Sequence, residues 1–227
     1  MKKYYILLAL LLSHILSDAQ RVNISFSAML AEKNLPLNSI IVNSEKDTLL
    51  VNQLKFYISN IQFLKDDSIV FTELNSYHLI DFEMPESSSI SIKTFRSISY
   101  NTIRFNLGID SLTNISGALG GELDPTHGMY WTWQSGYINL KMEGVANKSK
   151  GPSNEFQFHL GGYQQPFNAL QEVKLNVHDE NIHLVLNLDP VLHSIDFSNV
   201  YHIMSPSKKA VELSEILAKN FKVKKDE

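Results

Sequence analysis

Cysteine is absent from the 227-residue sequence. Disulfide bonds therefore cannot stabilise the protein, and its stability must come from a hydrophobic core. A metal site in this chain cannot use thiolate, so histidine, methionine and carboxylate remain as the ordinary ligands. For the same reason we expect no lipid anchor on a cysteine after the apolar N-terminal segment.

Basic clusters and catalytic sequence motifs are missing as well. The net charge is −4, and lysine and arginine are scattered as far as a short mixed-charge tail, Lys222–Glu227. This distribution argues against nucleic acid as a partner. The chain has no P-loop, no H-E-x-x-H and no G-x-S-x-G motif, and we expect that it is not an enzyme. A hydrolase assembled from scattered residues remains an alternative, because catalytic triads join distant positions.

Long apolar runs are confined to the N-terminus. Lys2 and Lys3 precede an apolar run, Ile6–Leu16, and small residues then occupy the −3 and −1 positions before Gln20. This order predicts a signal peptide over residues 1–19. The run is shorter than the roughly 20 apolar residues that span a bilayer, so an uncleaved anchor is the less favoured alternative. We expect an exported protein, periplasmic or secreted, that does not span the membrane after cleavage.

The sequence is rich in alternating apolar and polar residues, which are typical of half-buried antiparallel strands. The alternation is clearest over residues 22–28, 54–58 and 182–188. The other expected strands are 77–82, 90–92, 98–107, 130–143, 156–160 and 170–177. This many short strands predict an all-β fold, an antiparallel β-sandwich that forms a single domain over residues 20–227.

One hairpin and two helical segments complete the expected fold. Strands 170–177 and 182–188 are expected to form a hairpin about the polar residues between them. Residues 110–116 have the pattern of a turn or two of helix. Residues 206–221 predict a short C-terminal helix, because Ser205 or Ser207 can cap it and its apolar residues fall near one face.

Both tryptophans lie in one stretch, residues 123–144, with the sequence LDPTHGMYWTWQSGYINLKMEG. Alternate side chains of an extended strand share a face, so we expect Met129, Trp131 and Trp133 to lie together. Gly136 allows a bulge between these residues and the apolar set that follows. The alternative is that the three side chains only fill the core.

Two histidines are placed where they could join such a site. His127 precedes the tryptophan strand in a turn that contains proline and glycine. His159 lies in FQFHLGG, residues 156–162, where the alternation directs it away from Phe158 and Leu160. Imidazole together with a thioether suits copper better than magnesium or calcium. The alternative for both histidines is a solvated position on the surface.

The same segments resemble the MbnP-like proteins, an exported family related to methanobactin-associated MbnP and to the copper-repressed surface proteins of methanotrophs. The tryptophan stretch followed by FHLGG carries the resemblance most clearly. The segments LKFYISNIQF, YHLIDF and IRFNLGID extend it over nearly the whole chain after the predicted signal peptide.

The resemblance implies a periplasmic β-sandwich that binds copper as a carrier or chaperone. It further implies that a partner, a dihaem peroxidase-like enzyme, oxidises one tryptophan to kynurenine. Intact indole has no lone pair for a metal, whereas the opened ring has an amine and a ketone. The implied candidates for modification are Trp131 and Trp133, with Trp131 favoured, and the implied metal ligands are His159, His127, Met129 and Trp131.

One departure from the family pattern concerns the ligands. No histidine lies two residues after either tryptophan, and family members with an oxidised tryptophan have histidines close to it. The main alternative function is therefore a β-sandwich without metal, which displays its aromatic residues to a ligand or a partner protein.

Overall fold

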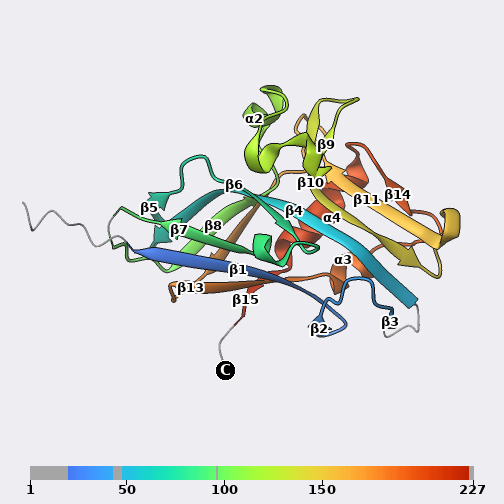
Figure 1. The fold of residues 1–227 in the computed structure, drawn as a ribbon, viewed down its shortest axis with the longest axis horizontal. Helices are drawn as coiled ribbons and strands as arrows, with labels where there is room; N and C mark the ends of the chain where they lie inside the picture. The colour runs from blue at the N-terminus through green and yellow to red at the C-terminus, as the bar shows by residue number, and fades with distance from the viewer. Residues whose placement is uncertain (1–19, 43–47, 96, 225–227) are drawn as a thin grey trace, which may run out of the picture.

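The computed structural model describes residues 20–42, 48–95 and 97–224. The predicted signal peptide, residues 1–19, lies outside the described residues. Two β-sheets pack face to face, with a small lobe above one of them (Figure 1). The prediction of an all-β, sandwich-like fold with a short C-terminal helix is confirmed. In the part of the chain that the structure describes, no helix is long and apolar enough to cross a membrane.

The first sheet is built around strand β1 (Arg21–Leu30). Its alternating burial follows the sequence alternation, with every second side chain in the core. Strand β13 (Asn181–Asn187) is parallel to β1, and the strands β2 (Lys33–Asn34) and β7 (Ser89–Lys93) pair with β1 in the antiparallel direction. The remaining strand of this sheet is β15 (Phe221–Val223).

The second sheet is built around the long strand β4 (Thr48–Lys65). Its main path runs β12-β8-β4-β10-β11-β14, and the shorter strands pair with β4 or β10. The strands on the main path are β8 (Thr102–Leu107), β10 (Gly136–Ala146), β11 (Glu155–Gly161), β12 (Gln171–Asn176) and β14 (His202–Ile203). The shorter strands are β3 (Ile41–Val42), β5 (Ser68–Thr72), β6 (Tyr77–Asp81) and β9 (Tyr130–Trp131).

A single large hydrophobic core fills the space between the two sheets. Phe26 of the first sheet meets Phe56 and Phe105 of the second, with ring centroids 6.1 and 6.5 Å apart. Both contacts are edge-to-face, the geometry that the ring quadrupoles favour. Because the apolar side chains of the second sheet face this core, its other face is free to carry polar groups.

Three helices flank the sheets. Helix α4 (Lys208–Lys219) lies across β11 and β12 and adds Leu213 and Leu217 to the core. The Ser207 side chain accepts a hydrogen bond from the Ala210 amide and caps this helix. The other two are α3 (Asp189–His193) and α2 (Ser111–Ile115), and α2 agrees with the helical segment expected at 110–116.

Two expected strand connections are wrong. Residues 170–177 and 182–188 do not form a hairpin, because β12 pairs with β8 in the second sheet and β13 pairs with β1 in the first. The tryptophan strand 130–143 is also not continuous. A turn over residues 132–135 separates β9 from β10, and the two strands pair with each other. Alternation specifies which face of a strand is buried, but not which strand lies beside it.

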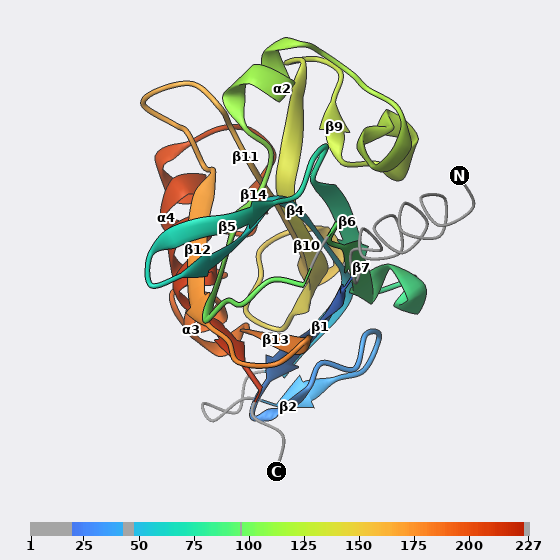
Figure 2. The ribbon, with the colours of Figure 1, turned by 90° about the vertical axis from the view of Figure 1, so that its left-hand side faces the viewer.

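A lobe sits on part of the outer face of the second sheet (Figure 2). It contains α2, the short 3-10 turns η2 (Gly121–Leu123) and η3 (Pro125–His127), and strand β9. A second, smaller apolar cluster lies beneath it. This cluster consists of Tyr57, Leu79, Ile109, Leu123, Met129, Trp131, Tyr137 and Ile138.

Candidate metal centre

Strand β11 carries His159 on the outer face of the second sheet, as the alternation predicted. Phe156, Phe158 and Leu160 of the same strand belong to the core between the sheets. His159 is nevertheless buried, with 6% of its surface exposed. Its Nε2 lies 2.5 Å from Oε1 of Glu143 on strand β10.

The hydrogen bond to Glu143 fixes the role of each nitrogen of His159. A carboxylate accepts, so Nε2 carries the proton and donates it to Glu143. The hydrogen bond lowers the pKa of Glu143, burial opposes this effect, and the charges of His159 and Lys141 add to it. Nδ1 of His159 is buried and has no hydrogen-bond partner among the described residues. In the neutral ring that nitrogen presents an unused lone pair.

Trp131 lies on the same face of the sheet, directly over Gly161. A Cβ atom on Gly161 would lie 2.8 and 2.9 Å from two carbons of the six-membered ring of Trp131, and 2.7 Å from the Tyr137 carbonyl oxygen. Only glycine therefore allows the indole to approach the strand this closely. Because Gly161 follows His159 by two residues, their side-chain positions share one face and lie about 7 Å apart along the strand.

Trp131 and its neighbours differ strongly in exposure. Trp131 is 5% exposed and Met129 is fully buried, whereas Trp133 is 65% exposed in the turn after β9. The expectation that all three share one strand face is therefore wrong, because the strand ends at Trp131. The two indoles still touch, with centroids 6.1 Å apart and planes tilted by 46°. Nε1 of Trp131 is buried and has no hydrogen-bond partner in the described chain.

Buried polar groups hold the lobe, and therefore Trp131, in place. Asn114 of α2 accepts a hydrogen bond from the Tyr137 amide and donates to the Ile109 and Asp110 carbonyl oxygens. The Tyr137 hydroxyl donates to the Leu123 carbonyl oxygen, at 3.1 Å. These bonds join α2, η2 and the start of β10 into one rigid unit that packs against the outer face.

A row of charged residues crosses the sheet beside His159. Lys141 lies opposite His159 on one side and opposite Lys55 on the other. Lys55 forms an ion pair with Asp81, at 2.7 Å, and a longer one with Glu83, at 3.3 Å. Lys141 has no ion pair among the described residues. Burial lowers the pKa of Lys141, the charge of Glu143 opposes this effect, and the charge of Lys55 adds to it.

His127 lies at the far side of this row, at the end of η3. Its Nδ1 donates to the Glu122 carbonyl oxygen, at 3.2 Å, because a carbonyl can only accept. It lines a pocket of about 560 Å³ together with His78, Lys55 and Asp81. Among the described residues, no hydrogen bond, ion pair or ring contact joins His127 to His159 or Trp131.

The amino-acid sequence identifies the family to which this chain belongs. The model of the family described as MbnP matches residues 19–205. The chain belongs to the MbnP family. The match covers the lobe and every strand except β15, includes every residue of the candidate centre, and ends just before helix α4.

A solved structure of this family has a similar fold. The structure of MbnP from Methylosinus trichosporium aligns with a TM-score of 0.59 over 86% of this chain and 87% of that chain. The sequence identity is 14%, so this likeness establishes a shared fold and nothing more specific. No curated protein matches the sequence at a significant level.

The centre of this MbnP-family chain differs from an ordinary metal site. Among the described residues, no three histidine or carboxylate side chains are grouped closely enough to hold a metal ion. The orphaned Nδ1 of His159 is one suitable donor, held in position by a carboxylate on its other nitrogen. This arrangement recurs around metal-bound histidines in proteins. One imidazole donor is therefore present at this position, and no group of three potential ligands surrounds it among the described residues.

Sequence reasoning missed Glu143 and Lys141 as part of this centre. Both occupy the polar positions of the alternating pattern in β10, and this alternation is the only sequence signal that places them on the outer face. Their relation to His159 depends on the register between β10 and β11. That register includes an irregularity between Ile138 and Leu140, which the sequence does not reveal.

Proposed function

We propose that this MbnP-family protein is an exported copper-binding protein, a carrier or chaperone, that holds Cu(I) between His159 and the Trp131 position. The observation that carries the proposal is the buried Nδ1 of His159, which has no partner while Glu143 orients the ring through Nε2. A neutral imidazole nitrogen with a fixed opposite proton is a ready ligand for copper.

The second ligand in this proposal comes from Trp131 after oxidation. Intact indole offers only an N–H donor, so unmodified Trp131 cannot coordinate the ion. Kynurenine in its place would offer an amine nitrogen and a ketone oxygen, on the same strand face as His159. The Trp131 ring packs closely on Gly161, which lies two residues from His159 on the same strand. Met129 and His127 remain predicted ligands, and Met129 packs in the same apolar cluster as Trp131.

The oxidation requires a partner, which we propose to be a dihaem peroxidase-like enzyme. Two molecules of hydrogen peroxide supply two oxygen atoms for cleavage of the indole C2–C3 bond and leave as water. Hydrolysis of the resulting formyl group releases formate and gives kynurenine, so the residue exchanges one carbon for one oxygen. Exposed Trp133 touches Trp131 and marks the side of the lobe from which such a partner would approach.

Mass spectrometry of protein from the native host tests the modification. The peptide that contains both tryptophans should show a net exchange of one carbon for one oxygen, and fragmentation should place the change on Trp131. A near-ultraviolet absorbance band beyond that of indole should accompany it. Copper binding by protein with two intact tryptophans would refute the role of the modified residue.

Thermal unfolding with and without Cu(I) tests copper binding itself. A ligand that binds only the folded state raises the melting temperature as its concentration grows above Kd. We expect such a rise for the modified protein and its loss in Trp131→Phe. Trp133→Phe, introduced after the modification has been established in the wild type, is the matched control and should keep the rise. A melting temperature that never responds to Cu(I) would leave a β-sandwich without a metal function.

A further inference from the structure

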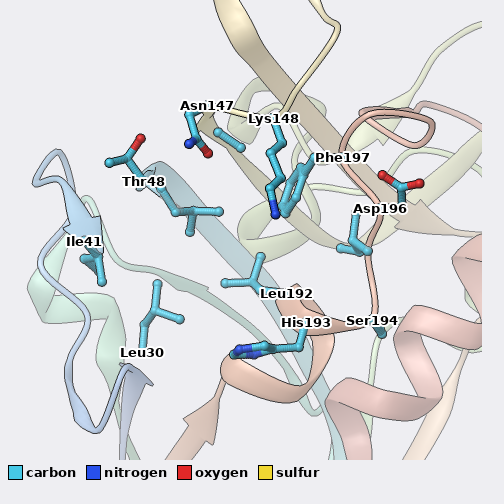
Figure 3. A pocket seen from close by; sticks show the side chains of 13 residues that line it. Leu30, Ile41, Thr48, Asn147, Lys148, Leu192, His193, Ser194, Asp196 and Phe197 are labelled. Atoms are coloured by element: carbon cyan, nitrogen blue, oxygen red, sulfur yellow. The ribbon is translucent and has the colours of Figure 1, made fainter. Parts of the chain in front are cut away.

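A second cavity lies at the other end of the sandwich from the candidate metal centre. Its volume is about 370 Å³, and it opens between the start of β4, the end of β10 and the segment that follows α3 (Figure 3). Ala146 of its wall follows Lys141 by five residues on β10, a separation of about 16 Å along a strand. The cavity is therefore separate from the metal centre.

The inner wall of this cavity is apolar. It is formed by side chains that are themselves mostly buried and that come from both sheets and the α3 segment. They are Leu30, Ile41, Leu49, Ala146, Leu192, Ile195 and Phe197. Ligand pockets in proteins occupy about 300–1,000 Å³ and are lined mainly by such residues with a few polar groups at defined positions. This cavity has the size and lining for a small organic molecule.

Two side chains that carry nitrogen, Lys148 and His193, stand at the mouth of the cavity. Figure 3 shows the Lys148 side chain running down into the cavity from one side and the His193 ring facing it from the other. Nδ1 of His193 donates to the Asp189 carbonyl oxygen, at 2.7 Å, which fixes the orientation of the ring.

Among the described residues of the lining one is acidic, Asp196, and its side chain is turned away from the cavity (Figure 3). Its carboxylate accepts hydrogen bonds from the Ser198 amide and hydroxyl and from the Asn199 side chain. The positive charge of Lys148 also contributes to lowering the pKa of Asp196. The ammonium group of Lys148 also borders the cavity (Figure 3).

We infer that this cavity binds a small carboxylate with an apolar body, such as a medium-chain fatty acid. The apolar body would fill the space against Leu49, Ala146 and Phe197, and the carboxylate would meet Lys148 at the mouth. Burial of the apolar body supplies the larger part of the binding free energy. The ion pair with Lys148 supplies the preference for an anion, because charged hydrogen bonds are stronger than neutral ones.

Calorimetric titration of the protein with three matched probes tests this inference without any mutation. Octanoate, octan-1-ol and octylammonium share one chain and differ only in their head groups. We expect octanoate to bind with one-to-one stoichiometry, octan-1-ol about tenfold more weakly, and octylammonium not at all at millimolar concentration. Equal affinity for the three probes, or no binding of octanoate, would overturn the inference.

Two lysine variants locate the site. Lys148→Met keeps the apolar stem and removes the charge, so it should abolish the preference for octanoate over octan-1-ol while octan-1-ol still binds. Lys150→Met is the matched control, because Lys150 is exposed and does not line the cavity. It should leave both affinities unchanged. The same loss of preference in both variants would mean that octanoate binds through general surface charge, and would refute the site.

Discussion

The Nε2 proton of His159 is donated to Oε1 of Glu143 over 2.5 Å, between neighbouring strands of one sheet. The bond leaves the other ring nitrogen buried and without a partner among the described residues. An unpaired buried nitrogen costs free energy unless something else satisfies it. In the proposed function that role belongs to copper, and the following predictions test the contacts that prepare the site.

Glu143→Gln should weaken Cu(I) binding about 10–100-fold, because the orienting partner of a ligating histidine typically has an effect of this size. The glutamine still fits the site but no longer holds the ring by a charged acceptor. A competition titration with a chromophoric Cu(I) chelator measures the change. Glu155→Gln, an exposed position at the start of the same strand as His159, is the control. An unchanged affinity in Glu143→Gln would show that the bond does not prepare a ligand.

The stability of the metal-free protein should depend on Glu143 at acid pH. The hydrogen bond from His159 lowers the pKa of Glu143 below the ordinary value of 4.5. A carboxyl whose folded-state pKa is lowered stabilises the fold above its unfolded value and loses that contribution as pH falls through the folded value. Urea unfolding should therefore show wild type more stable than Glu143→Gln by about 1 kcal/mol near neutral pH.

The difference in unfolding free energy between wild type and Glu143→Gln should shrink as the pH is lowered below the ordinary pKa of a glutamate carboxyl. A difference that stayed constant down to strongly acid pH would contradict the assigned hydrogen bond between His159 and the Glu143 carboxylate. It would instead indicate that the substitution acts through packing alone.

Gly161→Ala should displace Trp131. The added methyl group would lie under 3 Å from the indole ring and from the Tyr137 carbonyl oxygen, so strand or lobe must move. We expect a loss of about 2 kcal/mol of unfolding free energy and a change in tryptophan fluorescence. Gly120→Ala is a suitable control, since a methyl group there meets no atom within 4 Å. Equal stability of the two variants would mean that Trp131 does not pack on β11 as described.

Lys141→Met should stabilise the metal-free protein. The ammonium group of Lys141 is partly buried without an ion pair in the described chain, and burial lowers its pKa. A lysine with a lowered folded-state pKa destabilises the fold while it is charged, and the penalty fades as pH rises above that pKa. Chemical unfolding near neutral pH should show a gain on the order of 1 kcal/mol. A loss instead would reveal an attraction between Lys141 and the carboxylates of the row that outweighs its burial.

The sequence predicted the faces of the strands better than their partners. Alternation placed His159 opposite Phe158 and Leu160, and the structure confirms that placement. The hairpin expected between 170–177 and 182–188 is wrong, because those strands belong to different sheets. Parallel pairing of β13 with β1 joins residues about 160 positions apart, and such pairing has no local signal.

The candidate centre could be predicted only in part for the same reason. Trp131 and His159 were recognised from their segments, and the contact of the Trp131 ring with Gly161 brings those segments together. The turn at residues 132–135 moved Trp133 to the surface, because it ends the strand where the alternation alone allowed it to continue. Glu143 was missed, since its bond to His159 arises from the register of two strands and not from spacing along either one.

The most direct test is a Cu(I) titration of the oxidised wild-type protein beside His159→Ala, with exposed His202→Ala as the control. Wild type and His202→Ala should each bind one ion, and His159→Ala should lose that ion while it unfolds cooperatively as before. Retention of the full stoichiometry and affinity by His159→Ala would contradict the claim that the buried imidazole and the Trp131 position form one copper site.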